Sequence, residues 1–414
     1  GKPYFYKYKM IKRILYTLLI MFPVLASAQI NTDRVMAIGR NALYFEDYVL
    51  SIQYFNQVIN AKPYLSDPYF YRGLAKINLD DFQGAESDCS EAIERNPFVV
   101  SAYQVRGLAR IQQNNFAGAI EDYTKALEFD PENIGVWHNM ALCRIRQEDY
   151  KGAKNDLDKL IAISPRYTKA YLMRGEVDLK QKDTLAAEKD FGKAIEIDRY
   201  DADTWASRAI LRLQQQRYKD AEADFDHAIR LSTRNSGVYI NRALARYHQN
   251  NLRGAMSDYD IALDIDPNNF IGHYNRGLLR AQVGDDNRAI QDFNFVIEME
   301  PDNMMAIFNR GLLLDQTGDY KGAIKDYSTV INEYPNFLLG YQYRAQARRK
   351  IGDVKGADAD EFKVLKAQLD KQNGVDPNKQ TADNTENNKT RKKSDKNMNN
   401  YRKIVVADNE EGEE

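Results

Sequence analysis

Arginine and aspartate recur in this chain at a spacing that could pair them. Arg72, Arg106 and Arg276 are each followed 16 residues later by an aspartate. A guanidinium matches a carboxylate through two parallel hydrogen bonds, and a partly buried pair costs more to break than it gains over an apolar pair. Such pairs therefore serve register more than net stability. The predicted structural ion pairs are Arg72 with Asp88, Arg106 with Asp122, Arg276 with Asp292, and Arg310 with Asp326.

An arginine stripe could instead bind an anionic ligand. We favour pairing because an acid accompanies nearly every one of these arginines, either within one structural unit or between neighbouring units. Asp156 is an aspartate of this series without such an arginine, since the residue 16 positions before it is Met140. We expect this carboxylate to lack its arginine.

The residues that usually carry catalysis or bind metals show no comparable pattern. No histidine has a second histidine or cysteine at ligand spacing, and no glycine-rich phosphate loop follows a strand pattern. Cys89 and Cys143 lie in repeats that are separated by a whole repeat, which puts them out of reach of a disulfide, so we expect buried thiols. We therefore expect no enzyme, catalytic residue, metal, cofactor or small-molecule substrate. The histidines are His138, His227, His248 and His273.

The overall charge also limits the partners. The chain has 58 lysines and arginines against 60 aspartates and glutamates, which gives a net charge of −2. Proteins that bind nucleic acid through its phosphates usually carry excess positive charge. We expect no nucleic-acid partner.

The paired residues belong to a repeat of 34 residues, and ten contiguous units fit from Thr32 to Lys371. Position 8 of each unit is Gly or Ala, position 20 is Ala in nine units, and position 24 is usually aromatic. Small residues facing bulky ones let two helices pack closely. A polar turn separates the helices, and proline at position 32 ends the second one in seven units. Each unit is thus a helical hairpin that must stack on others to bury its apolar faces.

This pattern resembles the tetratricopeptide repeat family. The resemblance implies an all-α fold, a right-handed superhelical solenoid of tandem helix-turn-helix repeats over residues 29–371. The first helices of such arrays line a concave surface that usually binds peptides or proteins. The chain departs from the family at position 7, where the family is usually apolar and this chain has arginine in eight of ten units.

The resemblance places positions 2, 5, 6, 9, 12 and 13 of each repeat on the concave face. Position 6 is asparagine in units seven, eight and nine, which resembles the asparagine ladder that some family members use to hold a peptide backbone. An amide can donate and accept at once, so it suits main-chain groups of any sequence. The alternative is that these asparagines only face solvent. The candidate peptide-binding residues are Asn241, Asn275, Asn309, Tyr274, Phe308, Gln282 and Gln316.

The beginning of the chain has the pattern of an export signal. Lys12 and Arg13 precede a mostly apolar run over residues 14–25, which ends in the small residues 26–28. This order is typical of a cleaved signal peptide, and the alternative is an uncleaved membrane anchor. We predict a signal in residues 1–28, together with upstream residues before Met10, and an exported protein of the periplasm or cell envelope.

The end of the chain differs in composition from the repeats. Residues 372–414 are rich in asparagine, poor in apolar residues, and carry separated blocks of basic and acidic charge. Such a segment cannot offset the entropy cost of ordering, so we expect disorder. Residues 401–406 form a short apolar island within it that could dock or bind.

These features predict a non-enzymatic scaffold that binds protein or peptide partners on its concave face. Export together with a large binding surface favours a role in cell-envelope assembly or secretion, with any membrane association made through a partner. The alternative is a sensory or regulatory module of a longer protein whose further C-terminal part carries a catalytic or polysaccharide-binding domain.

Overall fold

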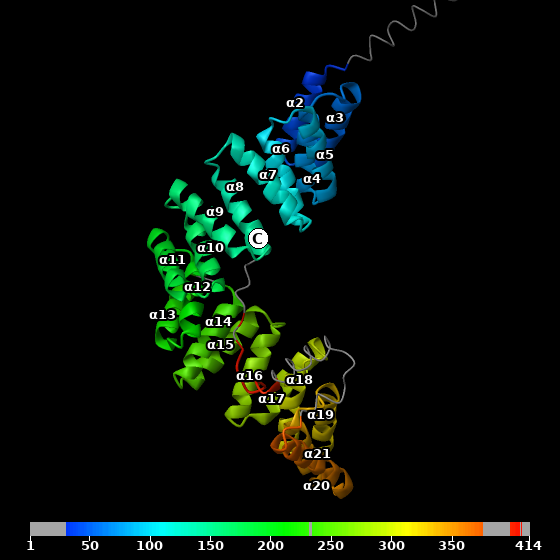
Figure 1. The fold of residues 1–414 in the computed structure, drawn as a ribbon, viewed down its shortest axis with the longest axis vertical. Helices are drawn as coiled ribbons and strands as arrows, with labels where there is room; N and C mark the ends of the chain where they lie inside the picture. Colours follow the sequence, from blue (N-terminus) through cyan, green and yellow to red (C-terminus); the bar gives the residue numbers. More distant parts are fainter. Residues whose placement is uncertain (1–29, 232–233, 376–397, 406, 408–414) are drawn as a thin grey trace, which may run out of the picture. The chain divides into compact units, whose positions relative to one another are not determined.

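A computed structural model describes residues 30–231, 234–375, 398–405 and 407 of the 414-residue chain. Over these residues the regular structure consists of helices, labelled α2 to α21, and contains no strand. The chain divides into two compact units, Gly1–Ile197 and Asp198–Glu414, and Figure 1 labels the helices of each. The predicted all-α fold of tandem helical hairpins is confirmed.

The described residues of unit one form five hairpins, each occupying one 34-residue repeat, and every one of these helices packs on the next along the chain. Its helices are α2 (Thr32–Tyr44), α3 (Tyr48–Ala61), α4 (Asp67–Asn78), α5 (Phe82–Arg95), α6 (Val100–Gln112), α7 (Phe116–Phe129), α8 (Ile134–Arg146), α9 (Tyr150–Ile163), α10 (Thr168–Lys180) and α11 (Thr184–Ile197).

In unit two the described residues form five further hairpins, packed in the same order. Its helices are α12 (Ala202–Gln214), α13 (Tyr218–Arg230), α14 (Ser236–His248), α15 (Leu252–Ile265), α16 (Phe270–Gln282), α17 (Asp286–Met299), α18 (Met304–Gln316), α19 (Tyr320–Glu333), α20 (Leu338–Lys350) and α21 (Val354–Gln372). The first helices of neighbouring repeats also touch, as α16 does with α18.

The turn inside each hairpin has a fixed local chemistry. The residue at position 15 takes a left-handed backbone conformation, for example Glu148 with φ of 60° and Gly318 with φ of 92°. The next residue caps the second helix in most repeats, as Asp149 does by accepting a hydrogen bond of 3.0 Å from the Gly152 amide. A side-chain cap of this kind satisfies a donor that has no partner within the helix.

The two helices of a hairpin interlock through the small residue at position 8. A Cβ atom added at Gly175 would lie 2.5 Å from Cε1 of Phe191, and one added at Gly107 would lie 2.9 Å from the Tyr123 ring. Both rings are almost completely buried. Glycine at these positions therefore gives the ring of the second helix the space it occupies, as the sequence pattern predicted.

Part of the segment expected to be disordered is ordered. Residues 398–405 and 407, called here the docked segment, pack on unit two, and Tyr401 and Ala407 are buried there. The sequence predicts disorder over residues 372–414, whereas the structure gives the docked segment a defined place, because its apolar side chains reach a surface that buries them. The predicted signal, residues 1–28, lies outside the described residues. Among the residues that are described, no helix combines the length and apolar character that a membrane span requires.

Candidate functional site

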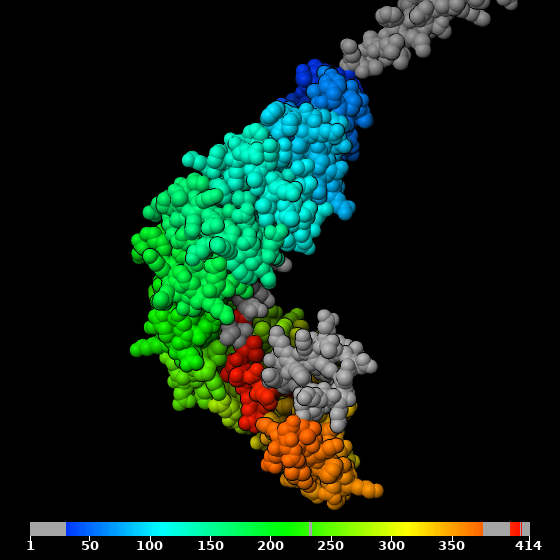
Figure 2. Space-filling view, viewed as in Figure 1, coloured from blue at the N-terminus to red at the C-terminus, as the bar shows by residue number. Residues whose placement is uncertain are grey.

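Three asparagines at position 6 of consecutive repeats lie under the docked segment. Asn241 belongs to α14, Asn275 to α16 and Asn309 to α18, and these three residues are called here the asparagine row. The docked segment runs along these helices in Figure 1, and Figure 2 shows its atoms against the surface of unit two. The 34-residue period brings the three amides to equivalent places on adjacent helices.

Two members of the row each bind both main-chain groups of one residue. The Asn275 amide nitrogen donates to the Val405 carbonyl over 2.7 Å, and its oxygen accepts from the Val405 amide over 2.9 Å. Asn241 makes the same two bonds to Ala407, at 3.0 Å and 2.9 Å. One repeat along the array thus corresponds to two residues along the docked segment, and neighbouring residues of one face of a strand are also two apart.

The third member holds a carbonyl together with a tyrosine. The Asn309 amide nitrogen donates to the Tyr401 carbonyl over 2.8 Å, and the Tyr274 hydroxyl donates to the same oxygen over 2.7 Å. Burial raises the pKa of Tyr274 above its ordinary value, so this hydroxyl keeps the proton that it donates. Asn309 contacts a residue four positions before Val405, because residues 398–403 turn, with the Lys403 amide donating to the Asn400 carbonyl.

The side chain of Tyr401 enters the apolar core of unit two. Its ring meets the Phe308 ring edge-on, with centroids 4.8 Å apart and an interplanar angle of 89°. Met398 is buried in the same cluster, which also includes Tyr327 and Phe337. Edge-to-face aromatic pairs of this kind add about 0.5–1.5 kcal/mol to the burial of the rings.

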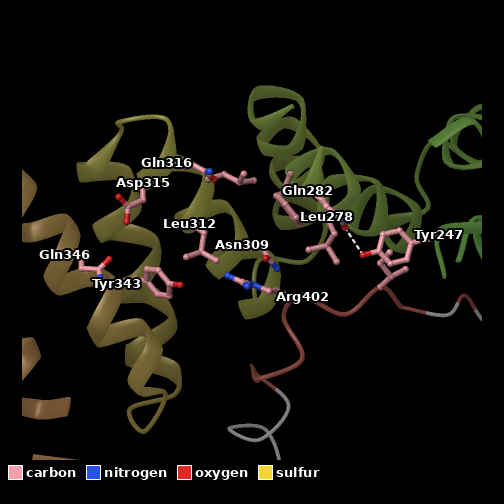
Figure 3. A pocket seen from close by; sticks show the side chains of 14 residues that line it. Tyr247, Leu278, Gln282, Asn309, Leu312, Asp315, Gln316, Tyr343, Gln346 and Arg402 are labelled. Carbon is pink, nitrogen blue, oxygen red and sulfur yellow. Dashed lines mark hydrogen bonds between the residues drawn. The ribbon is translucent and has the colours of Figure 1, made fainter. Parts of the chain in front are cut away.

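A cavity of about 650 Å³ opens beside the docked segment. Gln282 and Gln316, both at position 13, line it together with Asn309, and Figure 3 shows these side chains around the space. The Gln282 side-chain oxygen accepts a hydrogen bond of 2.7 Å from the Tyr247 hydroxyl. The cavity is large enough for several side chains of a bound peptide.

The structure thus places all seven candidate peptide-binding residues around the docked segment or the cavity beside it. The cavity is also lined by residues outside the predicted set, namely Tyr247 and Tyr343 on the helices and Arg402 and Ile404 on the docked segment. Tyr247 is at position 12 and Tyr343 at position 6, so the same positional pattern could have found them. The two residues of the docked segment carry no periodic signal.

The four predicted arginine–aspartate pairs form within their repeats, and their arginines also contact the preceding repeat. Arg276 donates from Nε and Nη2 to the two oxygens of Asp292, at 3.1 Å and 2.9 Å, and from Nη1 to Asp260 of the preceding repeat at 3.0 Å. The same fork joins Arg72 to Asp88, Arg106 to Asp122, and Arg310 to Asp326. Burial alone would raise the pKa of Asp292, but bonds from His273 and Arg276 and the nearby Arg280 hold it below its ordinary value.

Most of these forks therefore link two repeats as well as two helices. Their second contact reaches position 25 of the preceding repeat, which supplies a polar oxygen, whereas the Arg208 fork with Asp224 has Gly192 at that position. These acceptors are Asn56 for Arg72, Ser90 for Arg106, Asp158 for Arg174, Asp226 for Arg242, Asn294 for Arg310, and Ser328 for Arg344. A single guanidinium thus fixes the register of a hairpin against its neighbour.

Asp156 shows the effect of the missing arginine. Its Oδ1 accepts one bond of 3.2 Å from Arg144, while its buried Oδ2 has no hydrogen-bond partner. Burial raises the pKa of Asp156 from 3.8 to about 6, although the Arg144 charge opposes the shift.

The cysteines and histidines take part in packing. Cys89 and Cys143 are free and buried, and burial raises the pKa of these thiols to about 12 and about 11. His138 shares a hydrogen bond of 2.9 Å with the Tyr167 hydroxyl. Within the described part of the chain, no group of three or more histidine, cysteine, aspartate or glutamate residues is arranged to hold a metal ion.

Stacked helical hairpins with a row of main-chain-binding amides define a helical-repeat scaffold. Models of the tetratricopeptide repeat match residues 134–167, 168–201, 207–270 and 274–336, and a model described as TPR repeat matches residues 107–143. Together they cover more than half of the chain. The chain belongs to the tetratricopeptide repeat family.

Several solved structures resemble this chain, whereas the curated proteins include no match to it. A tetratricopeptide repeat protein from Parabacteroides merdae is 21% identical with a TM-score of 0.48, over 60% of this chain and 98% of its own. PilF of Pseudomonas aeruginosa is 20% identical with a TM-score of 0.43, over 49% of this chain and 92% of its own. YrrB, described as having an unusual peptide-binding site, is 20% identical with a TM-score of 0.37, over 44% of this chain and 95% of its own. None of these likenesses bears on what this chain binds.

Proposed function

We propose that this protein is a non-enzymatic scaffold that binds an extended segment of a protein or peptide partner along the asparagine row of α14, α16 and α18. The observation that supports this proposal is the bidentate bonding of Asn275 and Asn241 to the main chain of residues two apart. These bonds use no side-chain atoms of the bound segment. The row can therefore hold a peptide of any sequence, and neighbouring pockets supply the selectivity.

Burial makes a main-chain occupant favourable at this site. Asn241 and Asn275 are 1% and 0% exposed under the docked segment. A buried amide left without a partner costs about 1–3 kcal/mol. A segment that covers the row must therefore supply both a donor and an acceptor at every second residue, which an extended backbone does and a helix does not.

The proposal extends to the location of the scaffold. The positive, apolar and small-residue order over residues 10–28 supports export, and we propose a role in the assembly of the cell envelope or in secretion. Any membrane association is made through the bound partner, and neither nucleic acid nor a small-molecule substrate is part of the function.

Peptide selection on the full-length protein tests the binding function. Because the docked segment makes the same bonds to the row, both proteins in the test carry Met398→Ala and Tyr401→Ala, called here the open background. Peptides enriched from a random displayed library are synthesised and titrated against the open background and against the triple variant, which adds Asn241→Ala, Asn275→Ala and Asn309→Ala to it. Each substitution removes one or two bonds of about 0.5–1.5 kcal/mol each, so we expect the triple variant to bind at least about 100-fold more weakly.

The matched control is Asn139→Ala, which removes the asparagine at position 6 of repeat four, in the first of the two compact units. Asn139 contacts the Tyr123 hydroxyl at 3.4 Å and lies far in sequence from the row. Added to the open background, this change should leave the binding of the selected peptides unaltered. Selected peptides that bind the triple variant as tightly as the open background would contradict the proposed function.

A further inference from the structure

We propose that the docked segment is a built-in competitor, which occupies the asparagine row in the resting protein and which a partner displaces by presenting the same side-chain anchors. This inference rests on the proposed peptide-binding function and adds to it a regulation and a preferred partner sequence. The segment belongs to the same chain and is joined to α21 through residues 376–397.

The first anchor is an aromatic ring. Tyr401 is 6% exposed and packs edge-on against Phe308, and its carbonyl accepts the bonds from Asn309 and Tyr274. Met398 is buried beside it at 2% exposure. Unit two therefore binds both the main chain and the side chain of Tyr401, which makes Tyr401 the principal anchor of the docked segment.

The second and third anchors follow at intervals of three residues. Ile404 packs on the apolar cluster that includes Val238 and Leu244, and it lines the cavity. Ala407 is 3% exposed and lies in the cluster of Ile240 and Tyr259, where a larger side chain has little space. Arg402, Lys403 and Val405, which lie between the anchors, are exposed.

This arrangement specifies a partner sequence. The partner carries an aromatic residue, then an aliphatic residue three positions later, then a small residue three positions after that. Because Tyr401 meets repeat nine and Ala407 meets repeat seven, the bound segment runs opposite to the order of the repeats. Exposed positions between the anchors tolerate any polar residue.

Attachment to the same chain makes the docked segment an effective competitor. A tethered ligand has a local concentration on the order of millimolar, and a partner binds only the fraction of molecules whose site is open. The open cavity beside the segment gives a partner a place to make its first contacts before the segment leaves. Weakening the anchors should therefore increase the affinity for an added peptide.

The test uses a synthetic fluorescent peptide with the sequence of residues 398–408 and the full-length protein. The peptide is titrated against the wild type and against the double variant Met398→Ala, Tyr401→Ala, which loses the aromatic anchor of its own segment and the side chain buried beside it. We expect at least tenfold tighter binding to the double variant. Lys403→Ala, a change at an exposed position of the same segment, is the matched control and should bind like the wild type.

A second set of variants separates this proposal from the proposed function. Asn275→Ala added to the double variant should weaken peptide binding at least tenfold, and Asn139→Ala added to it should not. Equal affinity of the wild type and the double variant, with Asn275→Ala still weakening both, would overturn the competitor and leave the binding function intact. Peptide binding that Asn275→Ala does not alter would contradict the binding function itself.

The remaining outcomes also count against the proposal. Absence of peptide binding to the double variant would show that the segment is not a ligand of the asparagine row. Sedimentation that reveals dimers of the wild type but not of the double variant would show that the segment docks on a second copy. We expect both proteins to sediment as monomers at the concentrations used for titration.

Discussion

At the scale of single residues, the buried aspartates differ in whether each of their oxygens has a hydrogen-bond partner. The forks of Arg72, Arg106 and Arg276 satisfy both oxygens of their aspartates, whereas one oxygen of Asp156 has no partner. The pairing could be predicted from the sequence because every repeat gives equivalent positions the same neighbours. The bond to position 25 of the preceding repeat could not, since the acceptor varies among asparagine, serine and aspartate.

Met140→Arg should supply the guanidinium that Asp156 lacks. The Thr124 hydroxyl stands at position 25 of the preceding repeat, ready to accept its second contact. We expect the free energy of unfolding to rise by about 1–3 kcal/mol at pH 7, measured by urea denaturation. Ile38→Arg is the matched control, because Tyr54 takes the place of the aspartate there and no gain should follow.

The pH dependence of the free energy of unfolding shows whether Asp156 stabilises or destabilises the folded protein as pH rises. Its folded-state pKa of about 6 lies above the ordinary value of 3.8, so between these values the folded protein holds a proton that the unfolded chain has released. This residue therefore makes stability fall as pH rises from about 4 to about 6. Met140→Arg should remove that part of the decline, and a profile parallel to the wild type would contradict the pairing.

At the scale of elements, the contacts between neighbouring hairpins encode their register. Glu86 of α5 binds Arg110 of α6, and Glu222 of α13 binds Arg246 of α14. Lys154 of α9 and Asp178 of α10 stand at the same two positions with reversed charge, 2.8 Å apart. The acidic and basic residues have exchanged places, but the ion pair remains. This is expected of a contact that specifies which hairpins lie next to each other.

Charge reversal at this interface tests the register hypothesis. Lys154→Glu should lower the free energy of unfolding by about 2–4 kcal/mol, because Asp178 is 1% exposed and Asp190 lies beside it. Adding Asp178→Arg should restore most of the loss, since arginine at this position binds the aspartate of its own repeat elsewhere, as Arg110 does with Asp122. A double-mutant cycle with no coupling between the two changes would show that the pair carries no register information.

The turn of each hairpin was only partly predictable. The sequence predicts a polar turn but not its caps, which the structure has in most repeats at the residue before the second helix, such as Asp149. The left-handed residue before it is glycine in repeats eight to ten but Glu, Asp, Asn, Lys or Gln in the others. Only glycine marks this conformation clearly in a sequence, so seven of the ten turns carried no clear sign of it.

At the scale of the whole molecule, the 34-residue period predicts the helical hairpins but not the docked segment that packs on them. Asn241 and Ala407 are 166 residues apart, and nothing periodic connects them. The sequence indicated an apolar island at residues 401–406 and a row of amides, but their meeting depends on tertiary packing that neither pattern contains. The division between Ile197 and Asp198 is likewise invisible in the sequence, since the repeat passes through it without an insertion.

Amide hydrogen exchange in the full-length protein tests most directly whether the asparagine row binds a main chain. The account predicts that the Val405 and Ala407 amides exchange at least about tenfold more slowly than in the free peptide, because each donates to a buried asparagine oxygen. Asn275→Ala should release the Val405 amide, and Asn139→Ala should leave both protected. Exchange of these two amides at the free-peptide rate in the wild type would contradict the account.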